Sequence, residues 1–219
     1  DGSKRWEVGR SVYDFWIREY AGVDAESGKS LWYKDIPELD ENGDPLYDEI
    51  TGELKLTGER ETTETFSEAD RYYVGSSIPD LTGGITNSFE YSNYDLSVFV
   101  NFGLGGKVYD GSYAQLMHAG SYGRHWHADI LDRWTSENTG SQIPIIDGDQ
   151  DANGQSTRFL TDGDYLNIKN INLGYTLPNS LTQKFRVETL RVYCAADNIY
   201  LFSKRKGLDP QQSLSGTPD

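Results

Sequence analysis

The chain has 219 residues, of which 36% are hydrophobic and 13% aromatic, and it contains 23 glycines and 15 tyrosines. This abundance of tyrosine and of turn-forming residues favours strands and long polar loops over packed helices, so we expect an all-β fold. A net charge of −15 repels nucleic-acid phosphates and excludes nucleic-acid binding. The single cysteine, Cys194, excludes an intrachain disulfide framework and a zinc site of paired cysteines.

We expect neither a membrane-spanning helix nor a leader peptide within this sequence. No apolar run approaches the ~18 residues that such a helix needs. The first residues, Asp1-Gly2-Ser3-Lys4, do not begin a basic and then apolar leader. Barrel strands give a much weaker hydropathy signal than helices, so these absences leave the outer membrane open as a location.

The first predicted strand lies near residues 6–20. Tyr13, Phe15 and Ile17 share one parity there, and although a helix is an alternative, Gly9 and the aromatic content favour a strand. A long loop over residues 21–83 follows, which includes a turn at residues 26–29 and a strongly acidic stretch at residues 35–68. Loops of this length are usually functional or disordered.

The clearest pattern in the chain is a hairpin with strands near residues 84–91 and 94–102. Apolar and polar residues alternate in both runs, and Ser92-Asn93 separates them, which predicts an antiparallel pair with a tight turn. The second run has the ~9–11 residues that a transmembrane strand needs, with Tyr94 and Phe102 at the ends of its apolar face. An inward-facing strand of a soluble sandwich is the alternative.

A second long loop is predicted over residues 103–160, with a helical patch at residues 128–134. Strands return near residues 163–176 and 188–202. In the first of these, Asn167 and Lys169 interrupt the alternation, which either a β-bulge or a solvated stretch would explain. Short turns thus alternate with long loops, as periplasmic turns and extracellular loops do in outer-membrane barrels.

Six segments in order resemble the carboxy-terminal part of SusC/RagA-type TonB-dependent outer-membrane transporters. They are AGVDAESGKSLWYKD (21–35), ADRYYVGSSIPDLTGGITNSFEYSNYDLSVF (69–99), DRWTSEN (132–138), DGDYLNIKNINLGYTLP (162–178), LRVYCAADNIYLFS (190–203) and GLDP (207–210).

This resemblance implies that residues 1–219 are part of one antiparallel transmembrane β-barrel domain, with about six strands of a 22-stranded barrel and long extracellular loops containing short helices. The plug domain and the final strand of the family are expected to lie outside the chain. The implied function is TonB-dependent import of oligosaccharides or peptides across the bacterial outer membrane, with a SusD-like surface lipoprotein as partner and outer-membrane lipid around the wall. The alternative function is that of a soluble, secreted β-sandwich module that binds carbohydrate.

A calcium loop is one hypothesis for the acidic segment before residue 160. Asp149, Asp151 and Asn153, followed by Gly154, fit the first positions of an oxygen-ligand loop, but Leu160 stands where a bidentate glutamate would close it. A solvated acidic loop is the alternative. The run Asp40, Asn42 and Asp44 begins a similar pattern, with Pro45 in place of the required glycine.

The three histidines, His118, His125 and His127, lie within ten positions of one another, and the last two would share a face of an extended chain. They are candidate ligands for a transition metal, and the alternative is that they are ordinary polar residues of the loop. We identify no catalytic constellation and expect no enzyme.

Aromatic residues of the long loops either contact a ligand or partner or attach their loop to the barrel. The residues singled out for contact are Tyr122, Trp126 and Trp134.

Overall fold

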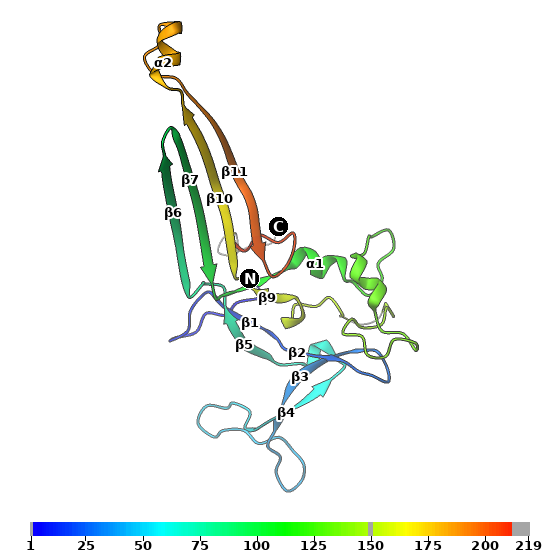
Figure 1. Ribbon diagram of the computed structural model, residues 1–219. Coiled ribbons are helices and arrows are strands. Elements are labelled where there is room, and N and C mark those ends of the chain that lie inside the picture. Colours follow the sequence, from blue (N-terminus) through cyan, green and yellow to red (C-terminus); the bar gives the residue numbers. More distant parts are fainter. Residues whose placement is uncertain (1, 149–150, 212–219) are drawn as a thin grey trace. The chain divides into compact units, whose positions relative to one another are not determined.

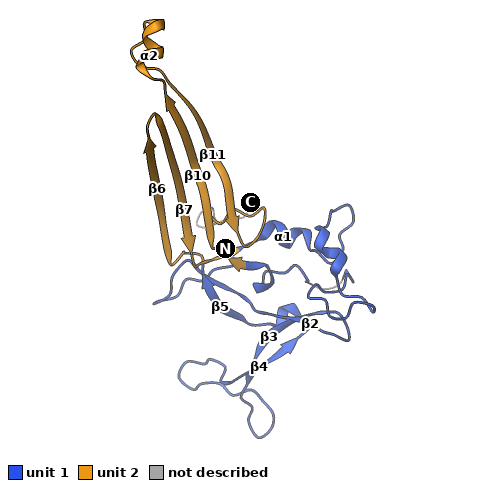
Figure 2. Ribbon diagram, viewed as in Figure 1, with its two compact units in different colours: residues 1–76, 109–160, 218–219 blue, residues 77–108, 161–217 orange. Residues whose placement is uncertain are grey.

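The computed structural model describes residues 2–148 and 151–211. Within these residues the chain divides into two units (Figure 2). Unit 1 comprises residues up to 76 and from 109 to 160, and unit 2 comprises residues 77–108 and those from 161 onwards.

Unit 2 is built on a sheet of four long strands that lie side by side (Figure 1). Every neighbouring pair is antiparallel, the spatial order is β11-β10-β7-β6, and β6 and β11 form the two edges. The strands are β6 (Leu81–Tyr91), β7 (Tyr94–Leu104), β10 (Tyr165–Thr176) and β11 (Arg191–Ser203). They have 11 to 13 residues each, about twice the usual length of strands in globular proteins.

The β6–β7 hairpin confirms the pairing expected from the alternating sequence. Tyr91 pairs with Tyr94 across the two-residue turn, and Ser92 adopts a left-handed conformation with a φ of 56°. Such a positive φ fits the twist of a two-residue hairpin turn.

A β-bulge accounts for the broken alternation in β10. The register with both β7 and β11 shifts between Ile168 and Asn170. Against β7, Lys169 is the extra residue, whereas against β11 the extra residue lies on β11. On β11 the shift is accompanied by Asn198, whose φ is 51°. Of the two explanations that the sequence allowed, the structure therefore selects the bulge.

Glycines in the sheet are covered by aromatic rings of the neighbouring strand. Gly83 pairs with Phe102 and Gly103 pairs with Tyr165, and a Cβ added at either glycine would lie within 3 Å of the facing ring. These rings supply the packing that the glycines lack, an arrangement known to stabilise strand glycines.

The connection from β10 to β11 contains α2 (Asn179–Thr182) and the 3-10 helix η4 (Gln183–Phe185). Two shorter strands, β8 (Lys107–Tyr109) and β9 (Leu160–Asp162), pair with each other.

Unit 1 contains strands within the segment that the sequence predicted to be loop from residue 21 to 83. They are β2 (Tyr20–Val23), β3 (Ser30–Pro37), β4 (Leu56–Thr63) and β5 (Arg71–Ser76), with the 3-10 helix η1 (Phe66–Glu68). β2, β3 and β4 form one sheet, whereas β5 pairs with β1 (Asp14–Arg18).

The strand expected near residues 6–20 was wrong in its bounds. Within residues 6–20, regular strand structure is confined to β1 and the first residue of β2. Before β1, Gly9 turns the chain with a φ of 84°, and the side chains of Trp6 and Val8 are exposed.

The predicted loop over residues 103–160 holds a small core of its own. α1 (Gly111–Leu116) was not predicted, and it begins where the Asp110 carboxylate accepts a 2.9 Å hydrogen bond from the Tyr113 amide, as an N-cap residue does. The expected helical patch at residues 128–134 is the 3-10 helix η2 (Ala128–Asp132), and a second one, η3 (Thr157–Phe159), follows. The core side chains are Ala114, Met117, Ile130 and Phe159.

Candidate functional site: an uncovered sheet face and its loops

One face of the four-stranded sheet is almost entirely apolar. Residues paired directly across neighbouring strands project to the same face, so the register assigns each side chain to one side. Only Gly83 and Asn87 interrupt this apolar face, which is formed by Leu81, Ile85, Phe89 and Tyr91 of β6, Tyr94, Leu96, Val98, Val100, Phe102 and Leu104 of β7, Leu166, Ile168, Ile171, Leu173 and Tyr175 of β10, and Val192, Cys194, Ala196, Tyr200 and Phe202 of β11.

The apolar face is open. Phe89 is 60% exposed, Leu173 48% and Val192 59%, although these side chains lie on three different strands. A β-sandwich buries such a face against a second sheet, and soluble proteins rarely expose contiguous apolar patches of this extent. The openness therefore favours a face that contacts lipid.

Aromatic residues bound the apolar face at both ends. The ring centroids of Tyr94 and Tyr175 lie 4.6 Å apart at one end, and those of Tyr200 and Phe202 lie 4.5 Å apart at the other. From Tyr94 to Leu104 the strand rises roughly 33 Å at ~3.3 Å per residue, which at a tilt of ~40° is about 25 Å along the membrane normal. This length suits the apolar band of ~25 Å between the aromatic girdles of outer-membrane barrels.

The opposite face is polar and carries an ion pair that spans three strands. The Arg191 guanidinium of β11 donates to both carboxylate oxygens of Asp95 on β7, at 2.9 Å and 2.5 Å. The pair crosses β10 at Gly174, where an added Cβ would lie 2.3 to 2.5 Å from the charged groups. Gly174 is thus the residue that makes room for the ion pair.

A second ion-pair cluster in unit 2 joins segments next to the strand ends. Lys107 and Lys204 both donate to the Asp162 carboxylate, the latter at 2.6 Å. These hydrogen bonds, that of Lys107 foremost, lower the pKa of Asp162 to about 2. The carboxylate is therefore charged at any physiological pH.

The calcium hypothesis for residues 149–154 is left untested, because Asp149 lies outside the described residues. Asp151 is exposed, and its carbonyl oxygen accepts from the Gly154 amide at 2.7 Å. Arg158 donates to the carbonyl of Ala152, so a guanidinium group already holds this turn. Among the residues that the structure describes, no group of acidic, histidine or cysteine side chains is arranged to hold a metal ion.

The acidic run that begins at Asp40 forms a turn in which the carboxylate serves the backbone. Oδ1 of Asp40 accepts from the amides of Asn42 and Asp44 at 2.8 and 2.9 Å, and these bonds, that of Asp44 foremost, lower the pKa of Asp40. Asp48 binds the amides of Ile50 and Thr51 in the same way. The signal for these turns is an aspartate followed by a glycine of positive φ, a pattern typical of Asx-turns.

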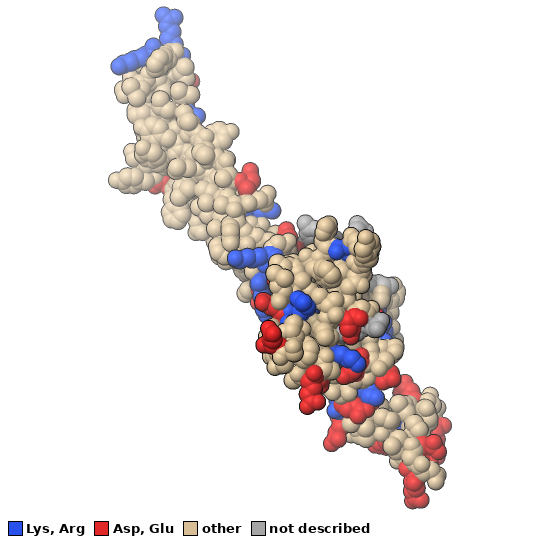
Figure 3. Space-filling view, turned by 90° about the vertical axis from the view of Figure 1, so that its right-hand side faces the viewer, with Lys and Arg blue, Asp and Glu red and all other residues tan. Residues whose placement is uncertain are grey.

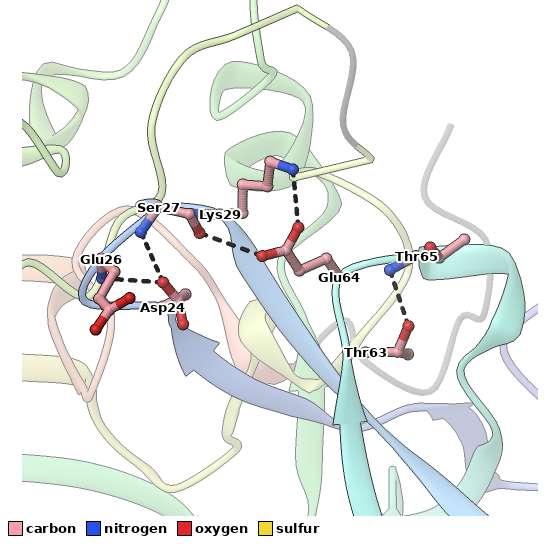
Figure 4. A network of polar contacts seen from close by, with 7 residues as sticks. All are labelled: Asp24, Glu26, Ser27, Lys29, Thr63, Glu64 and Thr65. Atoms are coloured by element: carbon pink, nitrogen blue, oxygen red, sulfur yellow. Dashed lines mark hydrogen bonds and ion pairs between the residues drawn. The ribbon is translucent and has the colours of Figure 1, made fainter.

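A third such turn belongs to the polar network of Figure 4, where Asp24 accepts from the amides of Glu26 and Ser27 at 2.9 and 2.6 Å. Glu64 then joins this turn to the end of β4, because it accepts from the Ser27 hydroxyl and pairs with Lys29 at 2.8 Å. The hydrogen bond to Glu64 raises the pKa of Lys29. The network orders a loop, and both partners of the ion pair remain partly exposed.

The three loop aromatics lie in different settings. The Trp134 ring packs over Gly28 and its Nε1 donates to the Ala25 carbonyl at 3.2 Å, so it attaches one loop to another. Trp126 stacks on His118 with ring centroids 5.1 Å apart, and part of its ring is exposed. Tyr122 is fully exposed. Contact with a ligand or partner stays a prediction for all three residues.

Two of the three histidines, His118 and His127, act within the loop as hydrogen-bond acceptors. Nδ1 of the buried His118 accepts from the amides of Gly120 and Ser121 at 3.2 and 3.1 Å, and Nδ1 of His127 accepts from the Asp129 amide at 3.2 Å. These lone pairs are therefore already used.

Long antiparallel strands with one open apolar face, aromatic residues at both ends and a polar opposite face define the wall of an outer-membrane β-barrel. Within the described ranges no helix is both long and apolar enough to span a membrane.

Comparisons with known proteins agree with this class. TonB-dependent receptor P3 of Formosa agariphila is 29% identical over 203 residues, which are 93% of this chain and 19% of that receptor. TonB-dependent receptor SusC of Bacteroides thetaiotaomicron is 25% identical over 78% of this chain and 16% of its own length. Among solved structures, the RagAB peptide transporter matches with a TM-score of 0.72 and 26% identity, covering 96% of this chain and 21% of that one. No family model matches.

These matches confirm the resemblance of the chain to the SusC/RagA-type TonB-dependent transporters, in sequence and in its antiparallel fold. The chain spans about a fifth of the length of the relatives it matches.

Proposed function

We propose that this chain forms wall strands and extracellular loops of a TonB-dependent transporter in the bacterial outer membrane. All its residues would belong to one barrel domain, and the parent protein would import oligosaccharides or peptides with a SusD-like surface lipoprotein. The TonB system would act through parts of the parent protein outside these residues.

The observation that carries the proposal is the open apolar face of the sheet. A lipid bilayer is the medium in which that face would be stable without further protein over it. The main alternative, a soluble carbohydrate-binding sandwich, requires the same face to be covered, and exposed side chains such as Phe89 and Val192 count against it.

The lengths of the connections support an orientation. β6 and β7 are joined by two residues and β10 and β11 by residues 177–190, whereas some sixty residues separate β7 from β10. Since outer-membrane barrels have short periplasmic turns and long extracellular loops, the connection from β7 to β10 would be extracellular and the connection from β10 to β11 periplasmic.

The substrate class rests on the relatives alone. RagAB is described as a peptide transporter, which favours peptides, while the resemblance to SusC keeps oligosaccharides as the second class. Tyr122 and Trp126 are the exposed loop aromatics through which either class could be bound.

The test is made on the full-length protein in its native cells. We expect it to remain in the outer-membrane fraction after carbonate washing, and we expect deletion of its gene to abolish uptake of a fluorescent peptide mixture or of labelled oligosaccharides. A protonophore should abolish the same uptake, because TonB-dependent import needs the inner-membrane proton gradient. Recovery of the protein in the soluble fraction would contradict the proposal.

A further inference from the structure

The connection between β10 and β11 is longer than a tight turn and is held in a defined conformation. The Leu177 amide donates to the Leu190 carbonyl at 2.8 Å, which extends the strand pair, and the Val187 amide donates to the Thr182 carbonyl at 3.2 Å. Thr182 is fully buried beneath this loop. The segment is therefore a folded cap on the end of the sheet.

The cap presents apolar side chains to its surroundings. Phe185 is 75% exposed, and Leu181, Val187 and Leu190 are exposed as well. Leu177 lies two residues after Tyr175, and Leu190 lies two residues before Val192, the partner of Tyr175, so both continue the apolar face towards the cap. The apolar face of the sheet thus extends beyond the aromatic residues Tyr94 and Tyr175 that bound it at this end.

Basic residues accompany these apolar side chains. Lys184 and Arg186 lie on either side of Phe185, and Glu188 is the acidic residue of the segment, so the cap is net positive in a chain whose net charge is −15. Lys and Arg side chains are visible at the α2 end of the sheet, whereas Asp and Glu gather on the unit that carries β4 (Figure 3). An aromatic residue between two cations, beside exposed leucines, is the composition of a segment that lies in a membrane interface.

We propose that residues 177–190 are an interfacial anchor, in which Phe185 inserts at the headgroup level of the adjoining leaflet while Lys184 and Arg186 bind anionic phospholipid headgroups. The proposal rests on the proposed function, since it requires the sheet to stand in a bilayer. The anchor fixes the depth of the β10–β11 end of the wall, because lifting it out would expose Phe185 to water and separate two cations from phosphate.

The experiment uses site-directed spin labels in the full-length protein, reconstituted in vesicles of phosphatidylcholine with or without phosphatidylglycerol. Native cysteines, Cys194 among them, are first replaced by alanine. Single labels at Phe185→Cys, at Leu173→Cys on the apolar face and at Tyr122→Cys in the exposed loop are compared by collision with oxygen, which concentrates in lipid, and with a water-soluble nickel chelate.

We expect the Leu173 label to collide mainly with oxygen, the Tyr122 label mainly with nickel, and the Phe185 label to lie between them. If Leu173 is in lipid but Phe185 behaves like Tyr122, the anchor is overturned and the proposed function stands. A Phe185 label shielded from both reagents would show that protein covers the cap and would also overturn the anchor. A Leu173 label in water would overturn the proposed function itself.

The charges are tested separately. Phosphatidylglycerol should reduce nickel collisions at the Phe185 label, and this reduction should be lost in the Lys184→Glu, Arg186→Glu variant. Arg124→Glu, Lys206→Glu, at two exposed positions outside residues 177–190, is the matched charge-reversal control and should retain it. Persistence of the reduction in the first variant would overturn the part assigned to the two cations.

Discussion

The four-stranded sheet and the loops of unit 1 are ordered in opposite ways. In the sheet, continuous ladders satisfy the backbone while side chains such as Phe89 and Val192 remain uncovered. In unit 1, short strands and turns are held by a small buried core around Met117 and Phe159 and by aspartates that bind backbone amides. The loops thus contain their own packing partners, whereas the sheet depends on the medium around it.

The largest test of this comparison places a charge in the middle of the apolar face. Val98→Arg should destabilise the full-length protein in phospholipid vesicles by about 2–4 kcal/mol, the cost of an arginine at the bilayer midplane. The adjacent Ser97→Arg is the control, because Ser97 projects to the polar face. The free energy of unfolding by guanidinium measures both, and equal costs would break the distinction between the faces.

The second test compares two glycines in the same kind of Asp turn of unit 1. Gly28 and Gly52 have φ values of 75° and 70°, but an added Cβ would clash with the Trp134 ring only at Gly28, since nothing lies within 4 Å at Gly52. Gly52→Ala should cost about 1 kcal/mol of backbone strain, and Gly28→Ala about 2–3 kcal/mol once the clash is added.

Hydrogen exchange of the Ile145 amide, which donates to the Gly28 carbonyl at 2.8 Å, reports the Gly28 effect. Similar costs at both glycines would mean that Trp134 does not hold this turn.

The third test concerns the ion pair on the polar face. Gly174→Ala should destabilise the sheet by about 1–2 kcal/mol, because the new methyl group separates Arg191 from Asp95 or displaces both. In an Asp95→Asn, Arg191→Gln background the same substitution should cost clearly less. Unfolding of the four variants in vesicles completes the cycle, and an unchanged cost in the double background would contradict the role given to Gly174.

The smallest expected effect is the pH dependence of the Asp162 cluster. The pKa of Asp162, about 2, lies below the ordinary value of 3.8. The cluster therefore contributes stability above pH 3.8, and this stability is lost as the pH falls towards 2. Lys204→Met should reduce stability by a constant amount above about pH 4, with the difference vanishing near pH 2. Lys206→Met removes a charge two residues away and should leave the acid profile unchanged; an equal effect would argue against a specific contact.

The sequence was sufficient to predict strands where the pairing partners are close in the chain and one face of the sheet is apolar. The β6–β7 hairpin needs only its alternation and the Ser92-Asn93 turn, and β10 and β11 carry the same pattern. The bulge at Lys169 was visible as broken alternation, but only the register with β7 distinguishes it from a solvated stretch.

The strands β3, β4 and β5 of unit 1 were missed for two physical reasons. β1 pairs with β5 across more than fifty residues, a contact that no local pattern encodes. β4 reads LTGERETT and is exposed over most of its length, so it lacks the apolar alternation by which strands are recognised. Asp40 begins a run spaced as in a calcium loop, but its carboxylate binds backbone amides. An aspartate at the start of a turn is typical of both a calcium loop and an Asx-turn, so the sequence alone does not distinguish them.

The outer edges of β6 and β11 each have a strand on one side only within the described residues. Their outward N–H and C=O groups are a template to which any extended segment can add. In a closed wall the neighbouring strands of the same protein occupy these positions. Produced in water as an isolated piece, residues of this span would instead be prone to join edge to edge with copies of themselves, so insoluble fibrous material is the expected product of such an attempt.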